Sequence, residues 1–380
     1  MEFAPDGKSL ASGGSDSKVC VWDLHTKKRR WSKELASPVR AVVFSPDTKW
    51  LASCDDSDRV CVWEVESGRP VQSWEHDQTT SNRLVFSPDN RFLASSDGFS
   101  TIRVWSLATG QETLRLSEGP SCLTFSPTGR ILAGGSMRYD DKRNGNKGRI
   151  STIQLWELVS GQKILSFEGD QESVDCLAFT SNGHALASGG TDGTILLWDL
   201  IGRKVHQPRT KLDAKELDRL WTELGGEAPK AFQAIWTLTA APEQAVTLLK
   251  QRLRPVTPAD PQRLTRWMRD LDSHEFAIRE QASKNLEELA ELAEPELRKC
   301  LQSQPPAEIR RRIEVLLQNL KSPVSSPHRL RAFRSIEILE QIGTPEAQQV
   351  VETLAKGEPI SRVTLEARFT LDRWHRSVHP

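Results

Sequence analysis

Apolar and polar residues alternate in short runs through the first half of the chain. In five of these runs, two branched aliphatic residues lie three and one positions before a tryptophan, as Val19 and Val21 do before Trp22. Alternation with a period of two, carried by branched aliphatic residues, predicts strands with a buried face. Turn residues such as Pro-Asp-Gly at 5–7 separate the runs, as expected between paired strands. The pattern therefore predicts an all-β first half.

These runs belong to a longer repeated phrase, F-S-P-D-x-x-x-L-A-S, in which a tryptophan follows twelve residues after the leucine. The phrase recurs with a period of about 40 residues, which is the period of one four-stranded propeller blade. The fixed place of each tryptophan on a strand predicts a core residue rather than a ring that stacks on a sugar or a cation. Five copies are found, with their tryptophans at Trp22, Trp63, Trp105, Trp156 and Trp198.

The segments LASGGSDSKVCVWDL (10–24) and LASGGTDGTILLWDL (186–200) resemble the WD-repeat β-propeller family, of bacterial type. The resemblance covers residues 1–207. It implies a WD-repeat propeller of five recognisable blades without enzymatic activity. Family blades often carry an aspartate six residues before the tryptophan, and Asp16 and Asp192 match this position. Ser57, Phe99 and Ile150 stand there in the other copies, so the resemblance implies an incomplete stabilising network.

The five copies also predict that the propeller is incomplete. Propellers of the family usually have seven blades, and the first copy here keeps little of its inner strand before Phe3. We therefore expect Met1 to be an internal start, with further blades upstream. A genuine five-bladed or open arc is the alternative, because propellers range from four to eight blades.

The fourth copy contains twelve extra residues between Leu132 and Trp156. Insertions in a repeat array map to loops, and loops carry function more often than the framework does. The insertion is therefore the candidate partner-binding loop, and a tolerated polar loop without a role is the alternative. Its candidate contact residues are Arg138, Tyr139, Asp140, Asp141, Lys142 and Arg143.

Beyond residue 207 the apolar spacing becomes that of amphipathic helices, as in Leu217, Leu220, Trp221 and Leu224. Helix starts are marked by a capping residue before a proline, for example at 260–261, 326–327 and 344–345. The segment 270–301 resembles a HEAT-type repeat. Residues 208–380 are therefore predicted to form an all-α HEAT-like domain, whose exposed face could bind a protein.

Charge and cysteine content narrow the functional classes. The 51 Lys and Arg residues balance 51 Asp and Glu residues, so no net charge favours nucleic acid or an anionic membrane. The six cysteines are scattered without the spacing of a zinc site or the density of a disulfide scaffold, which suits a cytoplasmic protein. No nucleotide-binding, hydrolase, kinase or zinc-protease motif is present, so neither an enzymatic activity nor a cofactor or metal is expected.

The sequence therefore predicts a non-enzymatic scaffold for protein–protein interaction that binds other proteins or peptides, without nucleic acid or membrane. The alternative is that the chain is the C-terminal fragment of a larger regulatory or catalytic protein, such as a kinase or transcription-factor fusion, with its active domain upstream of Met1. An enzymatic interpretation, in which the HEAT-like half resembles a bilin lyase component, rests on the degenerate helical motif alone.

Overall fold

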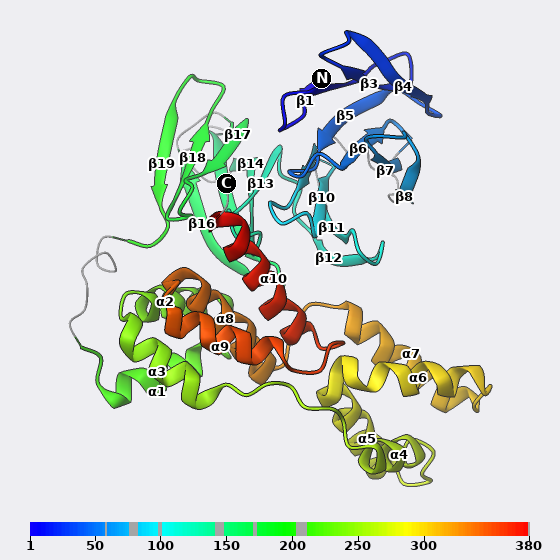
Figure 1. The fold of residues 1–380 in the computed structure, drawn as a ribbon, viewed down its shortest axis with the longest axis vertical. Helices are drawn as coiled ribbons and strands as arrows, with labels where there is room; N and C mark the ends of the chain where they lie inside the picture. The colour runs from blue at the N-terminus through cyan, green and yellow to red at the C-terminus, as the bar shows by residue number, and fades with distance from the viewer. Residues whose placement is uncertain are drawn as a thin grey trace. The chain divides into compact units, whose positions relative to one another are not determined.

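The computed structural model describes residues 1–57, 59–75, 83–97, 101–140, 148–169, 173–202 and 211–378, with the backbone alone for 138–140, 149 and 376–378. Two compact units divide the chain, Met1–Ile201 and Gly202–Pro380 (Figure 1). We call them the blade unit and the helical unit. The predicted domain boundary after residue 207 falls in 203–210, outside the described residues, and stays a proposal.

The blade unit consists of five antiparallel sheets that follow one another along the chain. Four sheets have four strands in sequence order, and the described part of the fifth has three. The strands are β1 (Glu2–Phe3), β2 (Ser9–Gly13), β3 (Lys18–Asp23), β4 (Lys28–Glu34), β5 (Val39–Phe44), β6 (Trp50–Asp55), β7 (Arg59–Glu64), β8 (Pro70–Glu75), β9 (Arg83–Phe86), β10 (Phe92–Ser96), β11 (Ile102–Ser106), β12 (Glu112–Leu116), β13 (Cys122–Phe125), β14 (Ile131–Asp140), β15 (Gly148–Glu157), β16 (Lys163–Gly169), β17 (Cys176–Phe179), β18 (Ala185–Gly189) and β19 (Ile195–Asp199).

Each sheet is one copy of the repeat, which confirms the predicted fold of WD-type blades followed by a helical part. We number the blades 1 to 5 in chain order. The repeat leucine pairs with the repeat tryptophan across neighbouring strands, as Leu51 does with Trp63 and Leu93 with Trp105. In four blades the indole N–H of the tryptophan donates to the serine of the L-A-S phrase, at 2.9 Å between Trp63 Nε1 and Ser53 Oγ. The repeated residues thus fix the register of each blade.

Consecutive blades pack face to face through the aliphatic pair that precedes the tryptophan. Val19 and Val21 of blade 1 lie in one core with Phe44 and Trp63 of blade 2. An aromatic residue on the outer strand adds a ring contact with the tryptophan of the next blade, and the Trp74 and Trp105 rings stack with their centroids 4.8 Å apart. The tryptophans of blades 2 to 4 are accordingly buried, which agrees with the core position predicted for them.

Aspartates hold the turn before the tryptophan strand. Asp16 accepts the backbone N–H of Lys18 at 3.2 Å, and Asp192 accepts that of Thr194 at 2.9 Å. These carboxylates therefore perform a local turn-capping task in blades 1 and 5.

Blades 2 and 3 lack an aspartate at that position, yet their turns are not bare. Asp55 and Asp97, each eight residues before its tryptophan, are buried and accept backbone N–H groups of the same turn. The turn carboxylate has thus moved two residues upstream. The stabilising network of turn aspartates, which the sequence predicts to be incomplete, is therefore partly present. A carboxylate at a nearby position accepts hydrogen bonds from the equivalent backbone amides.

The helical unit contains these described helices: α1 (Ala214–Glu223), α2 (Ala228–Thr239), α3 (Pro242–Arg252), α4 (Pro261–Asp270), α5 (Phe276–Leu289), the short η1 (Ala290–Ala293), α6 (Glu294–Gln302), α7 (Ala307–Lys321), α8 (Pro327–Ile342), α9 (Pro345–Ala355) and α10 (Arg362–Val378). Proline occupies the first turn of α4, α8 and α9, as the sequence predicts. Asp260 and Thr344 cap α4 and α9 through their side chains.

The helices are not stacked only in chain order. α8 packs against α2, α3, α9 and α10, whereas α4 to α7 have a core of their own (Figure 1). Within that core α5 and α7 lie side by side, and Arg312 pairs with Glu280 at 2.7 Å. The helix pairs α4–α5 and α6–α7 resemble neighbouring repeats. The contact of α2 with α8, in contrast, joins segments about 100 residues apart in the sequence. The HEAT-like assignment therefore stays a prediction.

Among the described residues, no helix has both the length and the apolar character needed to cross a membrane.

Candidate functional site

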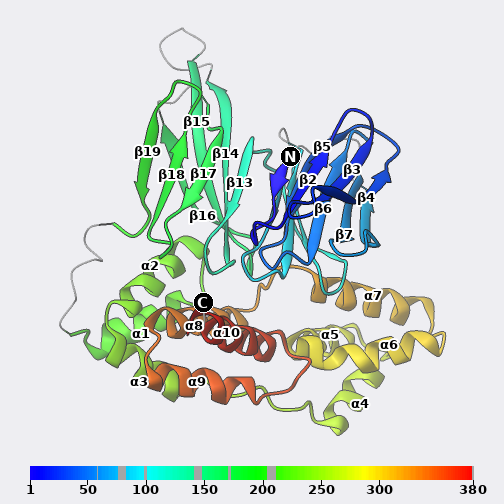
Figure 2. The same cartoon turned by 45° about the horizontal axis from the view of Figure 1, so that its top comes forward.

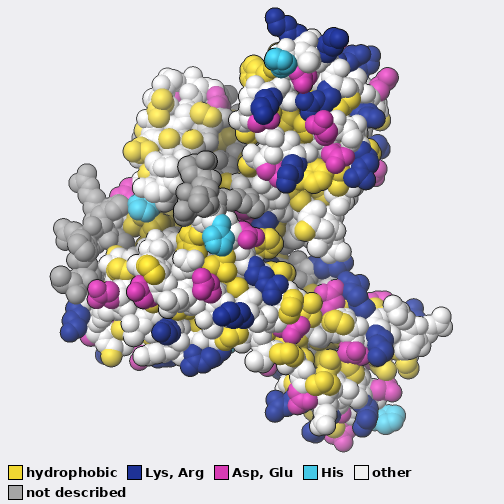
Figure 3. Space-filling model, in the orientation of Figure 1, with side chains coloured by type: hydrophobic (Ala, Val, Ile, Leu, Met, Phe, Trp, Pro, Cys, Tyr) yellow, Lys and Arg dark blue, Asp and Glu magenta, His cyan; other side chains and the backbone are white. Residues whose placement is uncertain are grey.

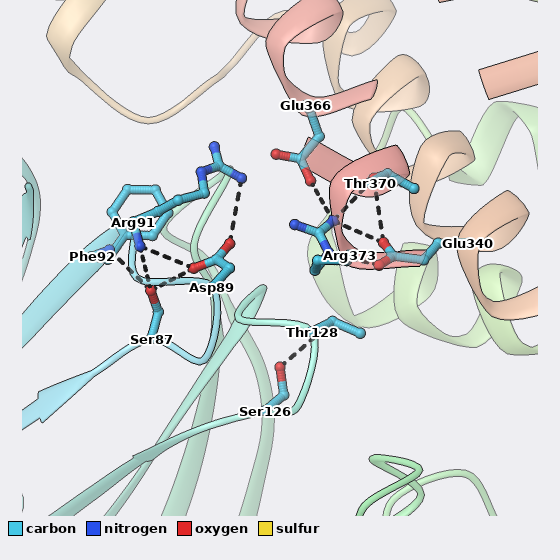
Figure 4. Close-up of polar contacts among 10 residues, drawn as sticks. All are labelled: Ser87, Asp89, Arg91, Phe92, Ser126, Thr128, Glu340, Glu366, Thr370 and Arg373. Carbon is cyan, nitrogen blue, oxygen red and sulfur yellow. Dashed lines mark hydrogen bonds and ion pairs between the residues drawn. The ribbon is translucent and has the colours of Figure 1, made fainter. Parts of the chain in front are cut away.

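The F-S-P-D phrase forms a self-capped turn between the first two strands of a blade. In blade 3, the Ser87 hydroxyl donates to Asp89 Oδ1 at 2.6 Å and accepts the backbone N–H of Phe92 at 2.9 Å (Figure 4). Asp89 Oδ1 also accepts the backbone N–H of Arg91, whose guanidinium lies 3.7 Å from Asp89 Oδ2. All these polar groups form hydrogen bonds or ion pairs within the turn. The recurrence of the F-S-P-D phrase is therefore explained by its role in forming the turn.

The other blades use the same chemistry with different residues. Ser45 and Asp47 repeat the contacts in blade 2, with the N–H of Trp50 donating to Ser45 Oγ at 2.9 Å. In blade 4, Ser126 and Thr128 replace the pair (Figure 4), and Thr180 and Asn182 do so in blade 5. Neighbouring turns also meet, because the N–H of Asp47 donates to Asn90 Oδ1 at 3.3 Å. The turns thus form a continuous row on one side of the blade unit.

A surface groove lies beside this row, between blades 1 and 2. Arg30 on β4 crosses it and pairs with Asp23 at 3.2 Å and with Glu66 at 3.0 Å. Hydrogen bonds from the backbone N–H and hydroxyl of Thr26, and from Arg30, lower the pKa of Asp23 to about 2. The groove is lined by Asp6, Lys8, Ser9, Arg30, Thr48, Lys49, Trp50, Glu64, Val65 and Glu66.

This groove is mixed in charge. Its lining includes carboxylates, the Arg30 guanidinium and the amines of Lys8 and Lys49, and among the described residues no cluster of histidine, cysteine and carboxylate side chains could hold a metal. A surface with both charge signs can be complementary to a polypeptide that also carries both. Sequence reasoning missed the groove because its walls come from two different copies of the repeat.

The predicted partner-binding loop is partly a strand. β14 and β15 pair over ten residues each, so the ladder continues through Arg138, Tyr139 and Asp140. Figure 2 shows these two strands extending beyond the ends of their neighbours. We call residues 136–140 and 148–152 the ribbon. It leaves the blade on the side opposite to the F-S-P-D turns, because β14 begins at the Thr128-Gly129 turn and runs away from it.

The structure therefore places half of the predicted contact residues on the ribbon and leaves the rest open. The backbone of 138–140 is on β14, whereas Asp141, Lys142 and Arg143 lie outside the described residues. Ile150 and Thr152 help to explain why the ladder continues, since β-branched residues favour a strand. Met137, at the base of this extension, is partly exposed.

Buried charges in the helical unit serve packing. Arg373 on α10 contacts Glu340 on α8 at 2.7 Å and Glu366 at 3.2 Å, and it also donates to Thr370 (Figure 4). All four side chains are largely buried or half-buried. Because each carboxylate meets a cation, the cluster joins α8 and α10 and offers no unpaired acid or base for catalysis.

The cysteines differ sharply in predicted reactivity. Burial raises the pKa of Cys54 to about 12 and that of Cys122 to about 11, so neither forms a thiolate near pH 8. Cys176 is exposed. We expect a disulfide reagent at pH 8 to modify Cys176 first and the half-buried Cys300 more slowly.

The measurement is the number of thiols that react in native protein at low micromolar concentration, followed by the number after unfolding in urea. The substitution Cys176→Ser should remove the fast phase. Rapid reaction of Cys54 or Cys122 in the native protein would contradict the buried positions.

Comparison with known proteins identifies the repeats. The WD40 family (WD domain, G-beta repeat) matches residues 1–23, 30–64, 68–106 and 161–199, which confirms WD40 repeats in the blade unit. The fourth copy, which carries the twelve-residue insertion, is matched only beyond its tryptophan. Fold and matches together define a two-unit protein whose first unit is built from WD40-type blades.

Curated relatives match only short segments. The pre-rRNA-processing protein IPI3 of Mycosarcoma maydis is 37% identical over 82 residues, which are 22% of this chain and 12% of the relative. The periodic tryptophan protein 2 homolog of Neurospora crassa is 31% identical over 98 residues, covering 26% of this chain and 10% of the relative. A crystal structure of the computationally designed Ika8 protein has 26% identity and a TM-score of 0.42, covering 51% of this chain and 56% of that one. The chain thus spans about a tenth of the curated relatives named.

Proposed function

We propose that this chain is a non-enzymatic scaffold that binds other proteins or peptides through its WD40-type blades. The observation that carries the proposal is the way the blades use their polar groups. The serine, aspartate and tryptophan side chains of the repeat form hydrogen bonds within the turns and between strands of the same blade. The groove and the ribbon remain as surfaces that can recognise another polypeptide.

The ribbon around Tyr139 is our first candidate contact surface. An extended two-stranded ribbon offers backbone groups at its edges and side chains on both faces, which is a common mode of peptide recognition. In blade 2 only the three residues 56–58 connect the corresponding strands β6 and β7, where blade 4 has 137–151. The additional length is therefore not needed to connect the two strands, which supports a role in binding.

Binding is tested by comparing the chain with a shortened ribbon, in which residues 137–151 are replaced by the Asp-Ser-Asp turn of blade 2. Both are used as bait in extract of the source organism, with and without RNase treatment, and each recovered partner is purified and titrated directly. We expect a partner whose affinity falls at least tenfold on shortening and whose covalent mass is unchanged by the complex. Val315→Glu, on an exposed position of α7, is the matched control and should keep the affinity.

Two results would refute parts of this proposal. Equal affinity of the shortened chain would exclude the ribbon, and covalent change of a partner would contradict a non-enzymatic role. Recovery that depends on RNA would contradict the predicted absence of nucleic acid, which stays a prediction because one relative is named a pre-rRNA-processing protein.

The comparisons give no support to a bacterial type, since the named natural relatives come from eukaryotes. They also give no support to a fragment of a larger kinase or transcription-factor protein. A cytoplasmic location and the absence of a cofactor remain predictions.

A further inference from the structure

The outer strand of blade 1 carries more positive charge than the outer strands of blades 2 to 4. Counted from the fifth residue after the repeat tryptophan to the end of the outer strand, blade 1 has five Lys and Arg residues, whereas blades 2, 3 and 4 have one each. Figure 3 shows Lys and Arg side chains gathered over the blade that contains β3 and β4. The single cations of the other blades pair with carboxylates, Arg69 with Glu64 at 3.7 Å, Arg115 with Glu112 at 2.7 Å and Lys163 with Glu118 at 3.0 Å. A blade of this kind therefore folds without a basic outer strand.

Three of the five cations in blade 1 have neither a carboxylate nor an aromatic partner among the described residues. Arg30 pairs with carboxylates across the groove, and the Arg29 guanidinium lies 5.9 Å from the centroid of the Trp22 ring. The other three side chains are exposed. We call them the basic edge: Lys27, Lys28 and Lys33. They present positive charge that the described part of the chain does not neutralise.

Lys27 stands at a position that favours glycine. The fifth residue after the tryptophan has a φ of 54° in Lys27, whereas blades 2 to 4 have glycines with φ of 66–67° there, namely Gly68, Gly110 and Gly161. A side chain in this left-handed region costs conformational energy that glycine avoids. Formation of the turn alone therefore does not account for the lysine.

Lys33 also departs from the repeat. The eleventh residue after the tryptophan is large and apolar in blades 2 to 4, namely Trp74, Leu116 and Phe167. In blade 1 the ring contact with the next blade is made by Trp31 instead, whose ring centroid lies 6.3 Å from that of Trp63. Lys33 is thus not needed for packing. Residues that break a local rule of the fold often mark a functional site.

β4 also offers a row of backbone groups to a partner. Among the described strands it pairs only with β3, so alternate N–H and C=O groups of its seven residues point away from the sheet. Blades pack face to face, and neighbouring blades leave this edge unpaired. β8 and β12 show this, because they remain the outermost strands of blades 2 and 3, which have a described blade on either side.

An unpaired strand edge with lysines beside it matches an extended segment rich in Asp and Glu. The main chain of such a segment can continue the hydrogen-bonded ladder, and its carboxylates can pair with the lysine ammonium groups. A nucleic acid would meet the same charge, but it has no peptide backbone to continue the ladder. The observations therefore favour a polypeptide.

Lysines on a strand edge can also serve only to prevent pairing with other strands. The outer strands of blades 2 to 4 are edges too, yet each carries a single cation that is paired with a carboxylate. Protection of an edge therefore does not by itself explain three lysines in blade 1.

We propose that β4 and the basic edge bind an extended acidic segment of another protein, which adds to blade 1 as a fifth strand. The proposal rests on the proposed function only in taking another polypeptide as the partner. Its surface is separate from the ribbon, which belongs to blade 4. The chain as a whole has no net charge, so the preference for acidic segments comes from this local group of lysines.

Fluorescence anisotropy of a labelled probe peptide tests the proposal with the 380-residue chain. The probe has about ten alternating glutamate and threonine residues, which is long enough to pair along β4. A second probe carries N-methyl groups on two neighbouring central residues, whose N–H groups point to opposite edges of a strand. Its charge is unchanged, but neither of its edges can form a continuous ladder. We expect the methylated probe to bind about tenfold more weakly.

Charge reversal locates the contact. Lys28→Glu and Lys33→Glu should each weaken binding of the acidic probe by about tenfold. Arg69→Glu is the matched control, because Arg69 is the sixth residue after its tryptophan in blade 2, as Lys28 is in blade 1. It makes the same change of charge at an exposed position and should keep the affinity. Circular dichroism verifies that each variant is folded.

Lys27→Gly separates folding from binding. Glycine suits the positive φ of this position, so the urea midpoint should rise. Loss of a lysine from the basic edge should at the same time weaken binding of the acidic probe. A variant that is more stable and binds the probe as tightly would contradict the proposal, since Lys27 would then have no part in recognition.

The proposal is wrong if the acidic probe does not bind when the chain is in large excess, or if the methylated probe binds equally well. An oligouridylate that binds more tightly than the probe, and is lost in Lys28→Glu, would make the basic edge a nucleic-acid site instead. The chain with the shortened ribbon keeps the basic edge and should bind the probe unchanged. Failure of the ribbon as a contact surface and failure of this proposal are therefore distinguishable.

Discussion

Replacing Leu93 by alanine is expected to destabilise the blade unit by about 3 kcal/mol, as is typical when a buried leucine leaves a cavity. Leu93 is fully buried and stands opposite Trp105 in blade 3, where blade 2 covers it. The substitution removes apolar contacts on both sides of the blade interface. The surrounding β-sheets are hydrogen-bonded and collapse only partly into the space.

Leu10→Ala is the matched control. Leu10 has the same repeat position and pairs with Trp22 in the same way, but it is only half-buried because no further described blade covers it. We expect its loss to cost about 1 kcal/mol. The comparison isolates the contribution of the neighbouring blade from that of the blade itself.

Urea unfolding combined with hydrogen exchange of peptides from blades 1 and 3 measures both substitutions in the intact chain. Equal destabilisation by the two substitutions would contradict the half-buried position of Leu10, since both leucines would then be covered alike.

Arg334→Met is expected to destabilise the helical unit by about 3 kcal/mol, because two buried hydrogen bonds from a charged donor are lost, each of which contributes about 1.5 kcal/mol. Arg334 on α8 is almost fully buried, and its Nη1 donates to the carbonyl oxygens of Leu224 and Gly226, both at 2.8 Å. These carbonyls follow α1, where a helix end leaves acceptors without intrahelical partners. Methionine fills a similar space but leaves the two buried acceptors without this donor.

Arg310→Met serves as control, because Arg310 is exposed on α7 and a surface charge contributes little. The free energy of unfolding and the hydrogen exchange of the α1 segment are measured for both variants. The expected result is faster exchange near residues 224–226 for Arg334→Met alone. An unchanged exchange rate there would show that Arg334 does not hold the end of α1.

Sequence reasoning was most successful where the physical cause is local. The five copies, their strands and the F-S-P-D turns follow from residues close together in the chain, such as Ser45 and Asp47. The helix starts at Pro261, Pro327 and Pro345 follow equally, because a proline at the first turn acts within a few residues.

The candidate surfaces were less accessible to sequence reasoning. The insertion was found from its length, but its continuation as a ribbon depends on pairing between Tyr139 and Arg149 across the ladder. The turn aspartates Asp55 and Asp97 were missed because a fixed count from the tryptophan excluded them. A carboxylate two residues earlier reaches the same backbone amides once the turn is folded.

The sequence by itself determined the blades, the helices and the residues that form each turn, since these depend on periodicity and on hydrogen bonds within a short segment. Only the tertiary structure decided which equivalent residues are buried. Val19 and Ile195 hold the same repeat position, yet the first is covered by a neighbouring blade and the second faces solvent. It also decided that α8 meets α2. Burial depends on what lies against a surface, and repeat spacing does not encode the neighbour.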